Sequence, residues 1–264
     1  MSATTTTRGS RPLAGLANLT VREAATWWAT GRWRLHTVVW VAVLAGLLTL
    51  MLWLLPAALE GTEAAGGVSG EPGEVALQFP DLAAVVIAIG VVLLTQGLLL
   101  DERRNGVLEW LLSKPVGRPA VVLAKFVGQG SALLATVLLV PWVAVHALLS
   151  VAAGQLWSPT NSLAALGTLT LVVFFHVALV LALSTLTSSR VAILAVPIVL
   201  IVTSDGITSL WPSLFHVMPW SLGPVASVLL AEGVLVSGWP IVATLGWTAG
   251  LLLAASLLLR RAEL

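Results

Sequence analysis

The segment from Asp101 to Lys125 reads DERRNGVLEWLLSKPVGRPAVVLAK and is the only long charged interval between two apolar runs. Charged residues make up only 9% of the 264-residue chain, so the eight charged residues of this interval are an unusual concentration. Apolar residues recur at helical spacing from Val107 to Leu112, and Pro115 follows them. Because proline cannot donate a backbone hydrogen bond, the pattern predicts a short amphipathic helix that ends before Pro115. We expect this helix to lie across the end of a membrane domain and to present one face outward.

The composition is that of a polytopic membrane protein. Hydrophobic residues make up 58% of the chain, and the mean hydropathy is +1.00. A membrane-spanning helix needs about 20 apolar residues, and the sequence lacks the alternating pattern of membrane β-strands. We therefore predict an all-α membrane protein. The absence of cysteine excludes disulfides and cysteine-ligated metals, and no basic run with interleaved aromatics points to nucleic acid.

Six membrane spans are predicted within a single domain, residues 20–264, after a disordered cytoplasmic N-terminus, residues 1–19. The spans cover about 36–55, 81–100, 121–149, 163–186, 191–210 and 241–259. Before the first span, Thr20 and Glu23 have the spacing of a capping box, which predicts an interfacial elbow helix that Gly31 ends. Between the last two spans, prolines and glycines interrupt the apolar segment from Trp211 to Pro240. Irregular backbone cannot face lipid, so we expect short broken helices there, on the outer side.

The distribution of cations predicts the orientation. All 13 lysines and arginines lie in the N-terminal segment, the loop after the second span, at Arg190 or in the C-terminal tail. In a six-span protein these four places are on the same side. The connections on the other side carry acidic residues and no cation: Glu60, Glu63, Glu71, Glu74, Asp81, Asp205 and Glu232. By the positive-inside rule, both termini and the charged loop are predicted to be cytoplasmic, in a plasma (inner) membrane.

The charged loop resembles the loop that follows the second span in ABC-2-type permeases, the membrane subunits of ABC exporters. The residues that carry the resemblance, in order and spacing, are Glu102, Gly106, Leu108, Glu109, Leu111, Leu112, Pro115, Val116, Arg118 and Lys125. The general layout of the chain is also similar, although only the loop is specific as a motif.

The resemblance implies that the loop is a coupling helix, which docks on a separate ABC ATPase subunit. The implied ATPase-coupling residues are Glu102, Arg103, Arg104, Gly106, Leu108, Glu109, Leu111, Leu112, Pro115 and Arg118. It also implies a second permease subunit, identical or related, so that the transporter is a dimer. We expect leucine and tryptophan side chains of the helix to fill a groove on the ATPase, and Glu102, Arg103 or Arg104 to set the register.

The sequence contains no recognisable catalytic motif. There is no G-x-x-x-x-G-K-[ST] phosphate loop, no H-E-x-x-H and no G-x-S-x-G motif. We therefore predict that the chain is not an enzyme and has no catalytic, cofactor-binding or metal-binding residues. ATP and Mg²⁺ are expected on the partner ATPase.

A few polar residues fall within the predicted spans, and three are candidates for a translocation path: Gln96, Gln129 and His176. A polar side chain at bilayer depth is costly unless it has a partner or a function. The alternative for each is an interhelical hydrogen bond. Asp205 is predicted near the outer boundary, where water satisfies its carboxylate, and His146 has no assigned role.

Two other classes of protein remain as alternatives to the exporter. An ion-coupled secondary transporter would need buried carboxylates near the membrane midplane, and the predicted spans place none there. A polytopic membrane enzyme or assembly factor would need catalytic groups clustered at one interface, and the sequence shows none, so a non-catalytic assembly factor is the form of this alternative that remains. Most of the 12 tryptophans flank the spans, which predicts anchoring in membrane lipids rather than an aromatic substrate cage. The cargo and the choice between homodimer and heterodimer are not encoded in any recognisable motif.

Overall fold

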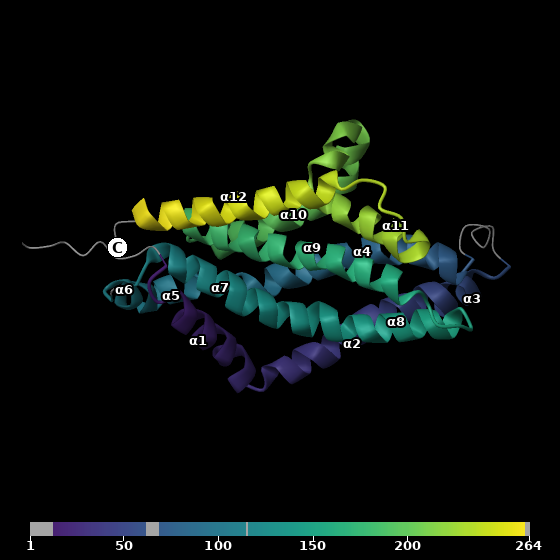
Figure 1. The fold of residues 1–264 in the computed structure, drawn as a ribbon, viewed down its shortest axis with the longest axis horizontal. Helices are drawn as coiled ribbons and strands as arrows, with labels where there is room; N and C mark the ends of the chain where they lie inside the picture. Colours follow the sequence, from purple (N-terminus) through teal and green to yellow (C-terminus); the bar gives the residue numbers. More distant parts are fainter. Residues whose placement is uncertain (1–12, 62–68, 115, 262–264) are drawn as a thin grey trace, which may run out of the picture.

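The fold is a bundle of long helices that run along the longest axis of the molecule (Figure 1). The computed structural model describes residues 13–61, 69–114 and 116–261, and this part of the chain contains no strand. Six helices are long and apolar enough to cross a membrane, namely Arg32–Leu59, Pro72–Arg104, Arg118–Ala152, Pro159–Leu186, Arg190–Leu210 and Trp239–Leu259. The all-α class and the six candidate spans are therefore confirmed, and several spans are longer than the sequence predicted.

The first and third spans each contain a wider, π-helical turn. The first span consists of α2 (Arg32–Thr49), η1 (Leu50–Leu54) and α3 (Leu55–Leu59), and the third of α7 (Arg118–Leu133), η3 (Leu134–Leu139) and α8 (Val140–Ala152). Pro56 and Pro141 follow these turns, and the carbonyl groups four residues earlier, at Leu52 and Val137, lie inside them. A proline ring clashes with that carbonyl in a regular helix, so we attribute both wide turns to the prolines.

The second and fourth spans form the centre of the bundle. The second span consists of α4 (Pro72–Thr95) and α5 (Leu100–Arg104), and the fourth is α9 (Pro159–Leu186). The second, third and fourth spans are half or more buried, whereas the first, the fifth (α10, Arg190–Leu210) and the sixth (α12, Trp239–Arg261) are mostly exposed. In α4, Gly90 lies under the Trp40 ring, and a Cβ there would be 2.1 Å from the ring. The small residue thus lets the first and second spans approach closely.

The N-terminal helix α1 (Leu16–Ala29) begins earlier than the predicted capping box. Thr20 lies inside the helix and its hydroxyl donates to the Leu16 carbonyl at 2.9 Å, while Gly15 precedes the helix with a φ of 83°. The prediction of a cap at Thr20 is therefore wrong, and residues 16–19 are helical rather than disordered. A turn with Gly31 in the left-handed conformation separates α1 from α2 as expected. The predicted disorder of residues 1–12 lies outside the described residues.

The interrupted segment after α10 forms short helices. They are η4 (Pro212–His216), η5 (Pro219–Ser221) and α11 (Leu222–Glu232), which Gly233 ends in the left-handed conformation. The apolar face of α11 is buried against α4 and α9, so this helix belongs to the bundle core. In Figure 1, η4 projects from the side of the bundle between α10 and α11.

Candidate functional site

Most of the predicted site residues lie in one region, the end of the bundle that carries α5 and α6, and one of them, His176, lines a second region, a pocket between α4, α9 and α10. Figure 1 shows α5, α6 and the C-terminal end of α12 at one end of the long axis, and α3 at the other.

A buried lysine joins three helices at the first region. Lys125 in α7 is 2% exposed, and its Nζ lies 3.1 Å from Glu23 of α1 and 2.8 Å from Glu102 of α5. Gln129, one turn further along α7, donates to the second oxygen of Glu23 at 3.5 Å. We call these four residues the Lys125 cluster. Gln129, which was predicted for the translocation path, therefore belongs to this cluster, and Glu102 pairs within its own chain.

The arginines of the loop bind the ends of neighbouring helices. Arg103 donates to the Ser184 carbonyl in the last turn of α9, and Arg104 donates to Ser188 just beyond it, both at 3.1 Å. Arg118 donates to the Leu259 carbonyl near the end of α12 at 3.2 Å. The last carbonyl groups of a helix have no partner within the helix, and cations are favoured there. Three of the predicted coupling residues thus fasten the loop to the bundle.

The short helix α6 (Val107–Leu112) begins after Gly106, which has a φ of 68°. Leu108 and Leu111 are buried in an apolar cluster with Leu99, Val121 and residues of α12. The expectation that these two leucines fill a groove on a partner is wrong, because they anchor α6 to its own bundle. Of the remaining predicted residues, Leu112 is the last residue of α6 and Pro115 lies outside the described residues.

Polar and aromatic side chains cover the opposite side of α6. Glu109, Trp110 and Lys114 are exposed, Trp110 to 53%. The Lys114 ammonium lies 3.6 Å from the centre of the Trp110 ring, a cation–π contact. We call these three residues the α6 outer face.

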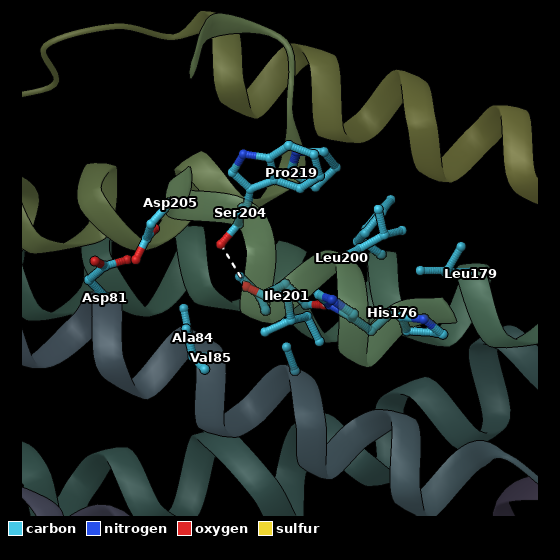
Figure 2. Close-up of a pocket in the computed structure, with 15 residues that line it drawn as sticks. Asp81, Ala84, Val85, His176, Leu179, Leu200, Ile201, Ser204, Asp205 and Pro219 are labelled. Carbon is cyan, nitrogen blue, oxygen red and sulfur yellow. Dashed lines mark hydrogen bonds between the residues drawn. The ribbon is translucent and has the colours of Figure 1, made fainter. Parts of the chain in front are cut away.

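The second region is a pocket in the membrane-spanning part of the bundle. Together with its open mouth it holds about 590 Å³ of empty space. Figure 2 shows Asp81 and Asp205 directed toward each other at one end and His176 at the other. The walls between them are mostly apolar and comprise Ala84, Val85, Ala88, Val172, Phe175, Leu179, Pro197, Leu200, Ile201, Ser204, Pro219 and Trp220.

The polar groups of the pocket are sparsely paired. His176 is 7% exposed, and its Nδ1 lies 2.8 Å from the Val172 carbonyl. A carbonyl can only accept, so Nδ1 carries the proton and Nε2 of the neutral ring is an acceptor. Within the described ranges, neither Nε2 nor the carboxylates of Asp81 and Asp205 have a hydrogen-bond or ion-pair partner.

A second, more open hollow adjoins this pocket. It holds about 890 Å³ of empty space and shares Asp81, Val85 and Asp205 with the pocket. Ser227 of α11 also lines it, is 3% exposed, and its hydroxyl is buried without a partner among the described residues. The two carboxylates therefore lie where two hollows meet.

The three residues predicted for a translocation path do not meet. His176 lines the pocket, Gln129 belongs to the Lys125 cluster, and Gln96 ends α4 and donates to the Leu93 carbonyl at 3.0 Å. Sequence reasoning missed Asp81, because it placed this residue at the start of the second span. The helix begins at Pro72 instead, so Asp81 is preceded by more than two helical turns. A carboxylate within an apolar run was the signal that could have identified it.

The helical bundle and its six candidate spans define a polytopic α-helical membrane protein. A family model described as ABC-2 family transporter protein matches residues 38–264, and the chain belongs to this family. The resemblance seen in the loop after the second span is thereby confirmed at the level of the family. A comparison with curated proteins finds no match.

Proposed function

We propose that the chain is the membrane-spanning subunit of an ATP-driven ABC-2 exporter. Membership of the ABC-2 transporter family supports this proposal, since such membrane subunits work with a separate ATPase. In the proposed complex the ATPase binds ATP and Mg²⁺, and a second permease subunit, identical or related, completes the translocation path. The exporter lies in the plasma (inner) membrane, and α1 is its elbow helix.

The α6 outer face is the proposed docking surface for the ATPase. Tryptophan is enriched among the residues that contribute most to protein–protein binding, and Trp110 is exposed on this face. The α6 outer face lies at the end of the bundle, and Leu108 and Leu111 anchor α6 to the bundle on its other side. This combination of an exposed Trp110 and a buried anchor is the observation that carries the proposal.

The remaining loop contacts give a route for movement from α6 into the membrane. The Lys125 cluster joins α5 to α1 and α7, and Arg103 joins α5 to α9. A displacement of α6 by the ATPase would therefore also displace the spans that contact α5. Glu102, Arg103, Arg104 and Arg118 act in this proposal as positioning residues rather than as docking contacts.

The orientation follows from the positive-inside rule. Among the described residues, the loop cations and Arg190 lie near α5 and α6, whereas Glu60, Glu71 and Glu74 lie in or beside the connection at the α3 end. We infer that α6 and both termini are cytoplasmic, where an ATPase has access to ATP.

Copurification tests the docking surface. In a strain that expresses the chain with its ATPase, we expect Trp110→Ala to reduce the ATPase recovered with the purified permease by at least tenfold, because hot-spot residues contribute about 2 kcal/mol or more. Trp239→Ala is the matched control, since Trp239 is also strongly exposed but lies on α12. Equal ATPase recovery from the wild type and from both variants would refute docking through α6.

A second pair of variants tests transmission. Glu102→Gln weakens the Lys125 cluster. Gly106→Ala strains the turn before α6 because Gly106 has a φ of 68°, although the new Cβ would make only an ordinary contact, 3.8 Å from a Glu109 carboxylate oxygen. We expect both variants to insert and to retain the ATPase, but to hydrolyse ATP with less transport for each ATP. Unchanged ATPase binding and transport would count against the assignment of this loop.

An ion-coupled secondary transporter is the second candidate, favoured by Asp81 and Asp205 at one pocket. Transport in vesicles separates the two functions. The exporter needs the ATPase and ATP and is indifferent to an imposed proton or sodium gradient, whereas the secondary transporter needs only the gradient.

A further inference from the structure

The charge of the pocket between α4, α9 and α10 is uncompensated. Asp81 and Asp205 face each other across one end (Figure 2), and no lysine or arginine lines the pocket or the adjoining hollow in the part of the chain that the structure describes. Two facing carboxylates without a cation repel each other, and the repulsion is stronger in an apolar environment than in water. A bound cation would remove this cost.

The donor set does not fit a bare metal ion. The described residues contain no group of three or more His, Cys, Asp or Glu side chains that could hold one. His176 lies at the far end of the pocket from the carboxylates (Figure 2). The space between them is lined by the apolar side chains of Ala84, Leu200 and Ile201, which offer no ligand to an inorganic ion. The pocket therefore fits a cation that carries an apolar body.

The ring of Trp220 has the chemistry that an organic cation requires. The Trp220 ring lines the pocket, and its Nε1 donates to Thr208 at 3.1 Å, which fixes the ring. An indole face attracts ammonium groups. In the adjoining hollow, which shares both carboxylates, Ser227 contributes a buried hydroxyl that has no partner in the described chain. At the other end of the pocket, Nε2 of His176 is an acceptor without a hydrogen-bond donor among the described residues. A buried polar group without a partner is costly, so the Ser227 hydroxyl also favours a ligand in the hollow that Asp81 and Asp205 line.

A close helix contact holds Asp81 in place. Gly223 of α11 lies directly against it, and a Cβ at Gly223 would be 2.2 Å from the Asp81 carboxylate. Only a residue without a side chain leaves room for the carboxylate there. The short helix α11 thus supports the negatively charged end of the pocket.

We propose that this pocket binds organic cations with an apolar body, with the cationic group between Asp81 and Asp205 and the body extending toward His176. The inference rests on the proposed function, because it names the substrate class of the exporter. The adjoining open hollow, which shares both carboxylates, is the route by which the ligand enters or leaves.

Binding to the purified permease, without the ATPase, tests the proposal. The probes share one carbon skeleton: 4-phenylbutylammonium is cationic at neutral pH, 4-phenylbutanol is uncharged and 4-phenylbutyrate is anionic. The permease is placed in nanodiscs of phosphatidylcholine, whose zwitterionic headgroups limit differences in partitioning, and binding is measured by calorimetry. We expect the amine to bind at least tenfold more tightly than the other two compounds.

Variants then assign the binding to the pocket. Asp205→Asn changes an exposed side chain, so the protein should fold normally. It should weaken amine binding by about tenfold or more, because the ammonium loses a charged hydrogen-bond acceptor, while alcohol binding stays unchanged. Asp81→Asn should act in the same direction, and Gly223→Ala should weaken amine binding by displacing Asp81. Glu60→Gln is the control, an exposed acid outside both hollows.

The outcome separates this inference from the proposed function. Equal binding of the three compounds, or amine binding that survives both Asp81→Asn and Asp205→Asn, would overturn the organic-cation pocket even if the ATPase drives transport. Amine binding that depends on both residues supports the pocket even if ATP proves unnecessary for transport, in which case the exporter proposal alone would fall.

Discussion

Lys125 is the charged residue whose removal should cost the most stability. It is almost completely buried and pairs with two carboxylates from different helices. Removing one partner of a buried ion pair costs about 3–5 kcal/mol, because the other charges stay buried and unpaired. Glu23 and Glu102 keep some contact with water, so we expect the low end of this range, about 3 kcal/mol, for Lys125→Met. The measurement is denaturant-induced unfolding in detergent.

Arg190→Met is the matched control for this prediction. It also replaces one cation by methionine, but the Arg190–Asp101 pair is about half exposed, with side-chain exposures of 46% and 50%. Exposed pairs contribute about 0–1 kcal/mol. Similar losses of unfolding free energy for the two variants would show that the buried cluster contributes no more than a surface pair.

The role of Lys125 illustrates what a sequence reveals about single residues. Its place in the charged loop, and the resemblance of that loop to ABC-2 permeases, were recognisable from spacing. Its partners were not, because Glu23 is about 100 residues away and reaches Lys125 only when α1 folds back on α7. The pocket carboxylates were hidden for the same reason, since Asp81 and Asp205 meet only through the packing of α4 and α10.

At the scale of elements, the contact between α1 and α7 depends on a glycine. A Cβ at Gly128 would lie 2.7 Å from the Glu23 Cβ and 3.2 Å from the Thr20 carbonyl. These atoms belong to the helix itself and cannot move without it. We therefore expect Gly128→Ala to displace α1 and to lower the unfolding free energy by about 1–3 kcal/mol, the usual cost of overpacking. Thermal unfolding in detergent measures the loss.

Gly246→Ala on α12 serves as the control for Gly128. Gly246 and Gly250 of α12 have nothing within 4 Å of an added Cβ in this chain. Alanine is favoured over glycine in a helix by about 0.5–1 kcal/mol, so this variant should be neutral or more stable. Losses of equal size at the two positions would contradict the close packing of α1 on α7.

The elements were predicted well where length and period alone determine them. The six spans and the helix ending before Pro115 follow from apolar runs and proline. The predicted start of α1 was wrong, because the Thr20 hydroxyl donates a hydrogen bond to a carbonyl within the helix instead of capping it. The prediction that the leucines of α6 face a partner was also wrong. An amphipathic pattern shows which residues share a face, but it does not show what covers that face.

For the molecule as a whole, the absence of cysteine allows the proposed topology to be tested one position at a time. Each introduced cysteine is the sole thiol of the chain. Ser113 follows α6 and Ser69 precedes α4, both side chains are exposed, and they lie at the two ends of the second span and its loop. Serine and cysteine have similar size, so neither change should disturb the fold.

We expect a membrane-impermeant maleimide to label Ser69→Cys in intact cells and Ser113→Cys only after the membrane is opened. The reason is the charge asymmetry, because the positive-inside rule predicts that the cationic α6 end stays in the cytoplasm and that the acidic α3 end crosses the membrane. Labelling of Ser113→Cys in intact cells would place the α6 outer face on the side without ATP, where no ATPase could dock on it. Labelling of both positions from outside would instead require an even number of crossings between them, which the single span Pro72–Arg104 cannot supply.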